Sequence, residues 1–142
     1  MKTFASLRVS IGLVGILFCP MAMAVPPMPN DVQMVQPDPS LPKELAGFWG
    51  KWEGSVGTQS FFLIIEKIDG ERATGYIWRS IDSVDWRRFE AKVAKEQGKF
   101  TLYTYTRVPG TEDRVRVDFT LKGEYLDVST LRGAGPRYKR VP

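Results

Sequence analysis

Carboxylates are the residues in this sequence whose type and spacing could support catalysis. The sequence contains no histidine and a single cysteine, Cys19. Catalytic triads and dyads that need an imidazole are therefore excluded within this chain, as are zinc sites built from nitrogen and sulfur ligands. Two acidic pairs, Asp82 with Asp85 and Glu53 with Glu66, have the residue types that cleave glycosidic bonds.

The positions of these acidic residues favour a structural role over a catalytic one. Asp82 and Asp85 lie in the segment SIDSVDW, whose polar spacing is typical of a loop between strands. Glu112 and Asp113 follow a Pro-Gly turn signal and offer too few ligands for Ca²⁺. Acidic residues in turns usually accept hydrogen bonds from the backbone or face solvent. We therefore expect a binding protein with no metal and no cofactor. A carboxylate-based hydrolytic accessory is the alternative.

The first 24 residues have the pattern of a secretory signal peptide. Lys2 and Arg8 come before or at the start of an apolar run over residues 9–18, and residues 22–24 read Ala-Met-Ala, which a signal peptidase accepts. The apolar run is shorter than the ~20 residues that a membrane-spanning helix needs. We predict cleavage after Ala24, no remaining membrane anchor, and a secreted or periplasmic protein.

The charge of the whole chain overstates its affinity for anionic partners. The chain carries 20 basic and 16 acidic residues, a net charge of +4. The leader contains Lys2 and Arg8 but no acidic residue, so its removal leaves a nearly balanced chain. This balance argues against nucleic acid as a partner. Cleavage of the leader also removes the only cysteine. The remaining chain can then form no disulfide and must be stabilised by its own core.

Repeated prolines predict that residues 25–46 form an extended linker. Each proline fixes φ and lacks a backbone N–H, which prevents a regular helix or a central strand. We expect a largely solvated tether, with a short turn of helix over residues 43–46 that leads into the domain. The folded domain is expected over residues 47–142.

From residue 47 onward, apolar residues recur with the period of two that indicates half-buried strands. The clearest case is 114–121, in which Val115, Val117, Phe119 and Leu121 share one face. With tight-turn signals between them, the expected strands are 48–54, 60–68, 73–79, 87–95, 99–107, 114–121, 125–131 and 137–141. The prediction is an all-β fold, an antiparallel up-and-down meander.

An eight-stranded meander is expected to close into a small barrel, because closure removes the unpaired edges of the sheet. The strand that contains SFFLIIEK is apolar on both faces. It should therefore be covered on the outside of the barrel as well as on the inside. The tether, a short helix or a second copy of the chain could provide this cover.

The start of the first strand carries a family resemblance. Gly50-Lys51-Trp52, within the segment GFWGKWEG, resembles the Gly-x-Trp signature of the lipocalins and the wider calycin group. In that family the tryptophan closes the narrow end of the barrel, and a basic residue from late in the chain packs across it. The resemblance implies a calycin-like barrel with a structural plug of Gly50, Trp52 and Arg137, with Arg132 and Arg140 as alternatives for the basic residue. The Trp-Gly pattern also resembles small secreted bacterial proteins of uncharacterised function.

Two kinds of ligand-binding surface are compatible with this pattern. A small apolar or amphipathic ligand inside the barrel would contact Phe62, Ile64, Phe89, Phe100, Leu102, Val117 and Phe119, although the same residues could simply fill the interior. A glycan or an envelope protein would instead stack on outward aromatic residues such as Trp78 and Tyr103. A purely structural envelope protein and a homo-oligomer both remain open.

Overall fold

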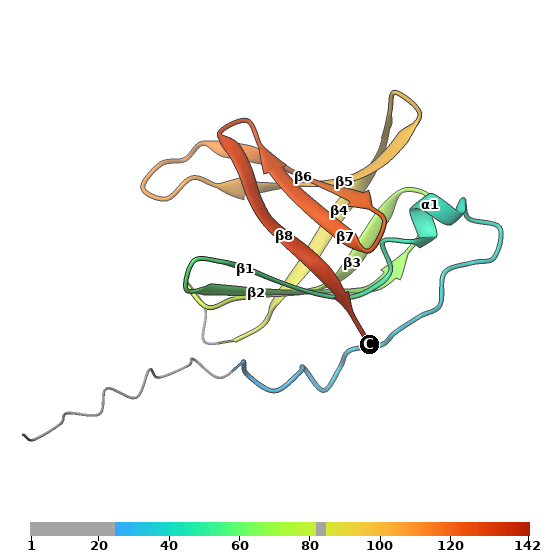
Figure 1. Ribbon diagram of the computed structural model, residues 1–142, viewed down its shortest axis with the longest axis horizontal. Helices are drawn as coiled ribbons and strands as arrows, with labels where there is room; N and C mark the ends of the chain where they lie inside the picture. The colour runs from blue at the N-terminus through green and yellow to red at the C-terminus, as the bar shows by residue number, and fades with distance from the viewer. Residues whose placement is uncertain (1–24, 82–84) are drawn as a thin grey trace, which may run out of the picture.

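The computed structural model describes residues 25–81 and 85–142, so the predicted leader lies outside the described residues. Eight antiparallel strands follow one another around a closed barrel in which β1 also pairs with β8 (Figure 1). The strands are β1 (Gly50–Val56), β2 (Gln59–Ile68), β3 (Arg72–Arg79), β4 (Arg87–Glu96), β5 (Lys99–Arg107), β6 (Arg114–Lys122), β7 (Tyr125–Thr130) and β8 (Gly133–Val141). The predicted all-β fold and its closed antiparallel meander are confirmed.

Tight turns with positive φ connect several neighbouring strands. Gln97 and Gly98 join β4 to β5 with φ angles of 51° and 78°. Two successive residues in this left-handed region match the twist of an antiparallel hairpin. These turns keep consecutive strands adjacent, which is why the meander needs no crossover.

The strand boundaries differ from the predicted ones mainly at the two ends of the barrel. Residues 48 and 49 belong to the link from α1 (Lys43–Ala46), because Phe48 N–H donates to the Leu45 carbonyl and Trp49 N–H to that of Ala46. Strand β8 begins at residue 133 rather than 137. The pairing of β7 with β8 shifts register between residues 127 and 129, where β8 has one more residue than β7 and includes Pro136, which lacks a backbone N–H.

The core follows the alternation of the strands. One face of each strand turns inward, and the enclosed side chains form a single apolar cluster. Its buried members are Leu45, Phe48, Trp52, Phe61, Leu63, Ile65, Ile68, Ala73, Phe89, Ala91, Leu102, Phe119, Leu126, Val128 and Tyr138. The segment that leads into β1 contributes Leu45 and Phe48, so it closes one end of the barrel with apolar side chains.

The proline-rich segment lies along the outer surface of the barrel and is not a free tether. Figure 1 shows it running beside β1 and β2 before it turns into α1. Val35 N–H donates to the Glu66 carbonyl (2.8 Å), and the Trp86 indole N–H donates to the Pro26 carbonyl (3.3 Å). The segment thus covers part of the second apolar face of β2, which the sequence required to be covered. Among residues 25–81 and 85–142, no helix is long and apolar enough to cross a membrane.

Candidate functional site

The wall of the barrel opens between β4 and β5. These two strands pair from Glu96 with Lys99 as far as Lys92 with Tyr103, and no pair beyond Lys92 with Tyr103 is formed. Both strands continue beyond this point, β4 back to Arg87 and β5 on to Arg107. Each remains paired with its other neighbour, β4 with β3 and β5 with β6. The remaining halves of β4 and β5 are therefore two unpaired strand edges on either side of a cleft.

The backbone groups that face this cleft follow from the alternation of hydrogen bonds. Val93 N–H donates to the Glu71 carbonyl at 2.8 Å, so every second residue back along β4 directs its backbone groups toward β3. The N–H and C=O groups of Glu90 and Arg88 then face β5. On β5, Val108 N–H donates to the Asp113 carbonyl at 2.9 Å, and by the same rule the groups of Tyr105 face β4.

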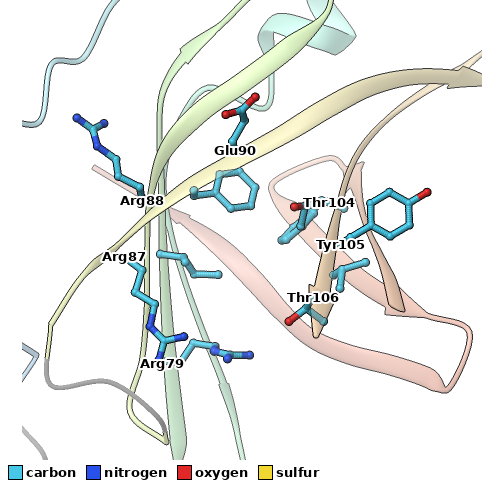
Figure 2. A pocket seen from close by; sticks show the side chains of 11 residues that line it. Arg79, Arg87, Arg88, Glu90, Thr104, Tyr105 and Thr106 are labelled. Atoms are coloured by element: carbon cyan, nitrogen blue, oxygen red, sulfur yellow. The ribbon is translucent and has the colours of Figure 1, made fainter. Parts of the chain in front are cut away.

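A cavity of about 240 Å³ occupies this cleft. Figure 2 shows Arg79, Arg87 and Glu90 on one side of it and Thr104, Tyr105 and Thr106 on the other. Its remaining lining residues are Ile77, Arg88, Phe89, Val117 and Phe119. The cleft thus leads from the outside of the wall to apolar side chains of the core.

The apolar floor of the cleft comes from three strands. Phe89 lies on β4 and Phe119 on β6, with ring centroids 5.4 Å apart in an edge-to-face arrangement. Val117 on β6 and Ile77 on β3 are half-buried beside them. Edge-to-face packing of this kind fixes both rings, so the floor is formed before any ligand arrives.

Two arginines lie on the inward face of their strands at the end of the cleft away from α1. Arg79 pairs with Phe61, which points into the core, and Arg87 pairs with inward-facing Ile77. Burial raises the pKa of the Tyr138 hydroxyl, and the positive charge of Arg79 opposes this rise. The cleft therefore combines an apolar floor with cationic side chains.

This combination of side chains is suited to binding. The lining offers guanidinium groups, threonine hydroxyls and one carboxylate, that of Glu90. Within the described part of the chain, no group of three or more acidic, histidine or cysteine residues is arranged to hold a metal ion. An amphipathic anion is the ligand that an apolar pocket with a few cationic groups fits.

The predicted interior residues divide between the cleft and the packed core. Phe89, Val117 and Phe119 line the cleft as well as the core. Leu102 is fully buried, and Phe100 packs against the core cluster beneath the Lys95 ammonium group, 5.2 Å from the ring centroid. Neither residue lines the cleft.

The predicted inward direction of Phe62 and Ile64 is wrong. Phe61 and Leu63 belong to the core cluster, so alternation turns Phe62 and Ile64 to the outside of the barrel. Phe62 packs there against the rings of Trp78 and Trp86, with centroids 5.8 and 6.3 Å away. An apolar strand has two equivalent faces in sequence, and only the pairing of the whole sheet decides which one is enclosed.

The two aromatic residues expected on an outer binding platform do not share one. Trp78 is 2% exposed and packs against Phe62. Tyr103 lies on the outer face of β5, where the Arg116 guanidinium lies 4.3 Å from its ring centroid and Tyr105 packs edge-to-face against it. A single stacking surface made from Trp78 and Tyr103 is therefore not formed.

At the closed end of the barrel, Trp52 lies in the core and Arg140 packs across it. Trp52 is completely buried, and its indole N–H donates to the Phe48 carbonyl at 3.0 Å. Arg140, directly opposite on β8, lies 4.2 Å from the Trp52 ring centroid. Its guanidinium also donates to the Trp49 carbonyl at 2.7 Å and to the Gly47 carbonyl.

The interpretation that placed Arg137 across Trp52 is wrong. Tyr138 is buried in the core, so alternation along β8 places Arg137 on the outer face. Its guanidinium there donates to the Asp127 carboxylate at 2.6 Å. Gly50 is required beside Arg140, since its φ is +126° and a Cβ would stand 2.8 Å from the Arg140 Nη1 atom.

Glu53 and Glu66 do not converge in the way that glycosidase chemistry requires. Glu53 pairs with Phe62, four residues along β2 from Glu66, a separation of about 13 Å at ~3.3 Å per residue. Retaining and inverting glycosidases need their two carboxyl groups about 5 to 9.5 Å apart. Asp82, the other candidate together with Asp85, lies outside the described residues.

The sequence pattern did not indicate that Arg79, Arg87 and Thr104 would meet. Arg79 and Arg87 both occupy inward positions of their strands. Strand alternation could have indicated this. Residue 79 is an even number of residues from inward-facing Ala73 and Ile77, and residue 87 from Phe89 and Ala91. Comparisons with protein-family models, with curated proteins and with solved structures found no match for this chain. Its function is therefore inferred from the geometry of the cleft.

Proposed function

We propose that this protein is a non-enzymatic binding protein that holds a small amphipathic anion in the cleft between β4 and β5. One observation carries the proposal, namely that the apolar floor of Phe89, Val117 and Phe119 lies in the same cavity as Arg79 and Arg87. The apolar part of the ligand would pack on that floor. Its anionic group would accept hydrogen bonds from the two guanidinium groups, which present paired donors to a carboxylate.

The size of the cavity supports a small ligand. Pockets for drug-sized molecules usually measure about 300 to 1,000 Å³, and this cleft measures about 240 Å³. The closed end of the barrel is occupied by Trp52, Leu63 and Leu126, each with no exposed surface. A ligand would therefore occupy the cleft and not the centre of the barrel.

The closed end supports the further proposal that the fold is lipocalin-like. Gly50 and Trp52 stand at the start of the first strand, and a basic residue from the last strand, Arg140, packs across the tryptophan. The leader-like composition of residues 1–24 supports a ligand that is encountered in the periplasm or outside the cell. A glycan is less favoured, because Trp78 is buried and does not join Tyr103 in one aromatic surface.

The proposal is tested by titrating octanoate into the protein and following amide chemical shifts or heat. We expect saturable binding, with the largest shifts at Phe89, Val117 and Phe119. Octylamine has the same chain with the opposite charge and should bind at least about tenfold more weakly, because one charged hydrogen bond contributes about 1.5 to 3 kcal/mol.

Paired variants separate the cationic group from a general effect of charge. Replacing Arg79 and Arg87 together by Gln should weaken octanoate binding at least about tenfold. Arg132→Gln, at an exposed position between β7 and β8, removes one positive charge away from the cleft and should leave binding unchanged. Failure of octanoate to bind, or equal binding of octanoate and octylamine, would contradict the proposal.

A further inference from the structure

We infer that the natural ligand of this cleft is an extended peptide, which enters between β4 and β5 as an additional strand with its terminal carboxylate at Arg79 and Arg87. This inference rests on the proposed function in one respect, because it uses the same cleft. It goes further by naming the chemical class of the ligand. The reason is that the cleft presents backbone hydrogen-bonding groups as well as side chains.

The two walls of the cleft are strand edges that face each other. Pairing between β4 and β5 stops at Lys92 with Tyr103, so the next pairs of the same register, Glu90 with Tyr105 and Arg88 with Arg107, are not made. Alternation directs the N–H and C=O groups of these four residues toward the cleft. A polypeptide in extended form carries donors and acceptors on both of its edges, and it can pair with both walls at once.

The length of the unpaired edges sets the length of the peptide. Residues 87–91 of β4 have no pairing with β5, and on the shorter edge residues 104–107 of β5 have none with β4. Four residues of extended chain span about 13 Å at ~3.3 Å per residue. A peptide of four residues therefore matches the length of the shorter edge, and only its inward side chains enter the cavity of about 240 Å³.

The two sides of the wall specify the side chains of such a peptide. In an extended strand, successive side chains point to opposite faces. Those that point inward would meet Phe89, Val117 and Phe119, so alternate residues of the peptide should be apolar. Those that point outward would lie near Glu90 and Tyr105, which are exposed, and can be polar.

Charge fixes the direction of the peptide. Figure 2 places Arg79 and Arg87 at the end of the cleft where β4 begins, and Arg88 points away from the cavity. The Arg88 guanidinium lies on the outer surface, 2.6 Å from Glu66 and 3.3 Å from Asp31. A terminal carboxylate at Arg79 and Arg87 makes the peptide antiparallel to β4 and parallel to β5.

The test uses the tetrapeptide acetyl-Ser-Val-Ser-Val with a free carboxyl terminus, titrated into the protein by calorimetry or NMR. We expect saturable binding with the largest amide shifts at Glu90 and Tyr105. The same peptide with an amidated terminus should bind at least about tenfold more weakly, since it lacks the group that Arg79 and Arg87 recognise.

Two N-methylated peptides test the pairing without any change to the protein. Neighbouring amides of an extended peptide point to opposite edges, so methylation of either central amide should weaken binding at least about tenfold if both walls pair. Weakening by only one of the two methyl groups would show pairing with a single edge and would overturn insertion between the strands.

A backbone variant tests the same contact from the side of the protein. Glu90→Pro removes an N–H that faces the cleft and leaves the pairing with β3 in place, whereas Glu90→Ala removes the side chain alone. We expect Glu90→Pro to bind the tetrapeptide at least about tenfold more weakly than Glu90→Ala does, because both variants lack the carboxylate and only the first also lacks the backbone N–H.

The possible failures are distinguishable. If octanoate binds and the free-acid tetrapeptide does not, the peptide inference is overturned while the proposed anion site stands. If neither binds, both are overturned. If light scattering shows a dimer in which the Glu90 and Tyr105 amides are protected, a second copy of the chain occupies the cleft, which also overturns a peptide ligand.

Discussion

The backbone of β2 leaves no room for a side chain at Gly75. It is buried on β3, and a Cβ at this position would stand 1.8 Å from the Ile64 carbonyl oxygen on β2. That atom belongs to the backbone, so it cannot move aside as a flexible side chain would. The close approach lies beside a register shift between Ile65 and Lys67, where the two strands bend together.

We predict that Gly75→Ala lowers the free energy of unfolding by about 3 kcal/mol or more, because the strands must separate to admit one methyl group. Gly70→Ala is the matched control, since nothing lies within 4 Å of a Cβ at that position. Urea unfolding followed by tryptophan fluorescence measures both. A loss for Gly75→Ala no larger than that of the control would show that the β2–β3 contact is looser than described.

Asp127 shows how a partly exposed ion pair makes stability depend on pH. The Arg137 guanidinium, followed by the Lys122 ammonium, lowers the pKa of the Asp127 carboxyl from 3.8 to about 2. The carboxylate lies 2.6 Å from Arg137 Nε and 2.9 Å from Lys122 Nζ. A carboxyl whose pKa is lowered on folding stabilises the folded state above its ordinary pKa, and this stabilisation is lost as the pH falls through the folded value.

Asp127→Asn should therefore destabilise the protein by about 1 kcal/mol near neutral pH, because the side chains of Arg137 and Lys122 are 61% and 63% exposed and solvent screens the pair. The difference between variant and wild type should shrink between about pH 4 and pH 2. Thermal unfolding of both proteins across this range measures it. A difference that is constant over the range would mean that the charge of Asp127 does not contribute.

At the scale of elements, the proline-rich segment and the outer face of β2 act as one unit. Glu66 is 8% exposed and accepts hydrogen bonds from Arg88 Nη1 at 2.6 Å and from the Gln33 backbone N–H at 3.2 Å. Arg88 also lies over the ring of Tyr76, 4.3 Å from its centroid. Burial, followed by the neighbouring Asp31, raises the pKa of the Tyr76 hydroxyl to about 12. One carboxylate thus joins the segment, β2 and β4.

Glu66→Gln should loosen the proline-rich segment without opening the barrel. We expect a loss of about 1 to 2 kcal/mol, less than for a fully buried pair, because Arg88 is 61% exposed. Limited proteolysis should then cut residues 25–42 faster than in the wild type. Glu71→Gln, at an exposed position on the β2–β3 turn, is the control and should leave the cutting rate unchanged. Equal cutting in both variants would contradict a role for Glu66 in holding the segment.

The fold was predictable from the sequence because most strands carry their own alternation. In β6, Val117 and Phe119 share the inward face that the period of two indicates. The same rule could not orient β2, whose two faces are both apolar, so Phe62 and Ile64 were expected inside and lie outside. The proline-rich segment that covers them is held by contacts between residues far apart in the chain, and such contacts leave no local pattern in the sequence.

The candidate site was less predictable than the fold, because it depends on strand pairs that are not made. Residues 87–91 and 104–107 contain no glycine or proline that would mark where the pairing of β4 with β5 ends. Strand alternation could have selected Arg140 rather than Arg137 as the residue at Trp52, since Tyr138 and Arg140 share one face of β8. That choice required knowing that Tyr138 points inward.

At the scale of the whole molecule, the barrel combines a packed end with an interrupted wall. Trp52, Phe48 and Leu45 close the end near α1 and are at most 1% exposed. In the other half, β4 and β5 separate and leave the cleft. Amide hydrogen exchange reports such a break directly, since an amide without a cross-strand partner exchanges without unfolding of the barrel.

We predict that the amides of Glu90 and Tyr105 exchange at least about tenfold faster than those of Lys92 and Tyr103. The four amides point toward the same space between β4 and β5, but only the last two belong to a pair that the register makes. Exchange followed by NMR at one pH and temperature compares them within a single sample. Comparable protection of all four amides would mean that the wall is closed in solution, and both the proposed anion site and the peptide site would then lack an entrance.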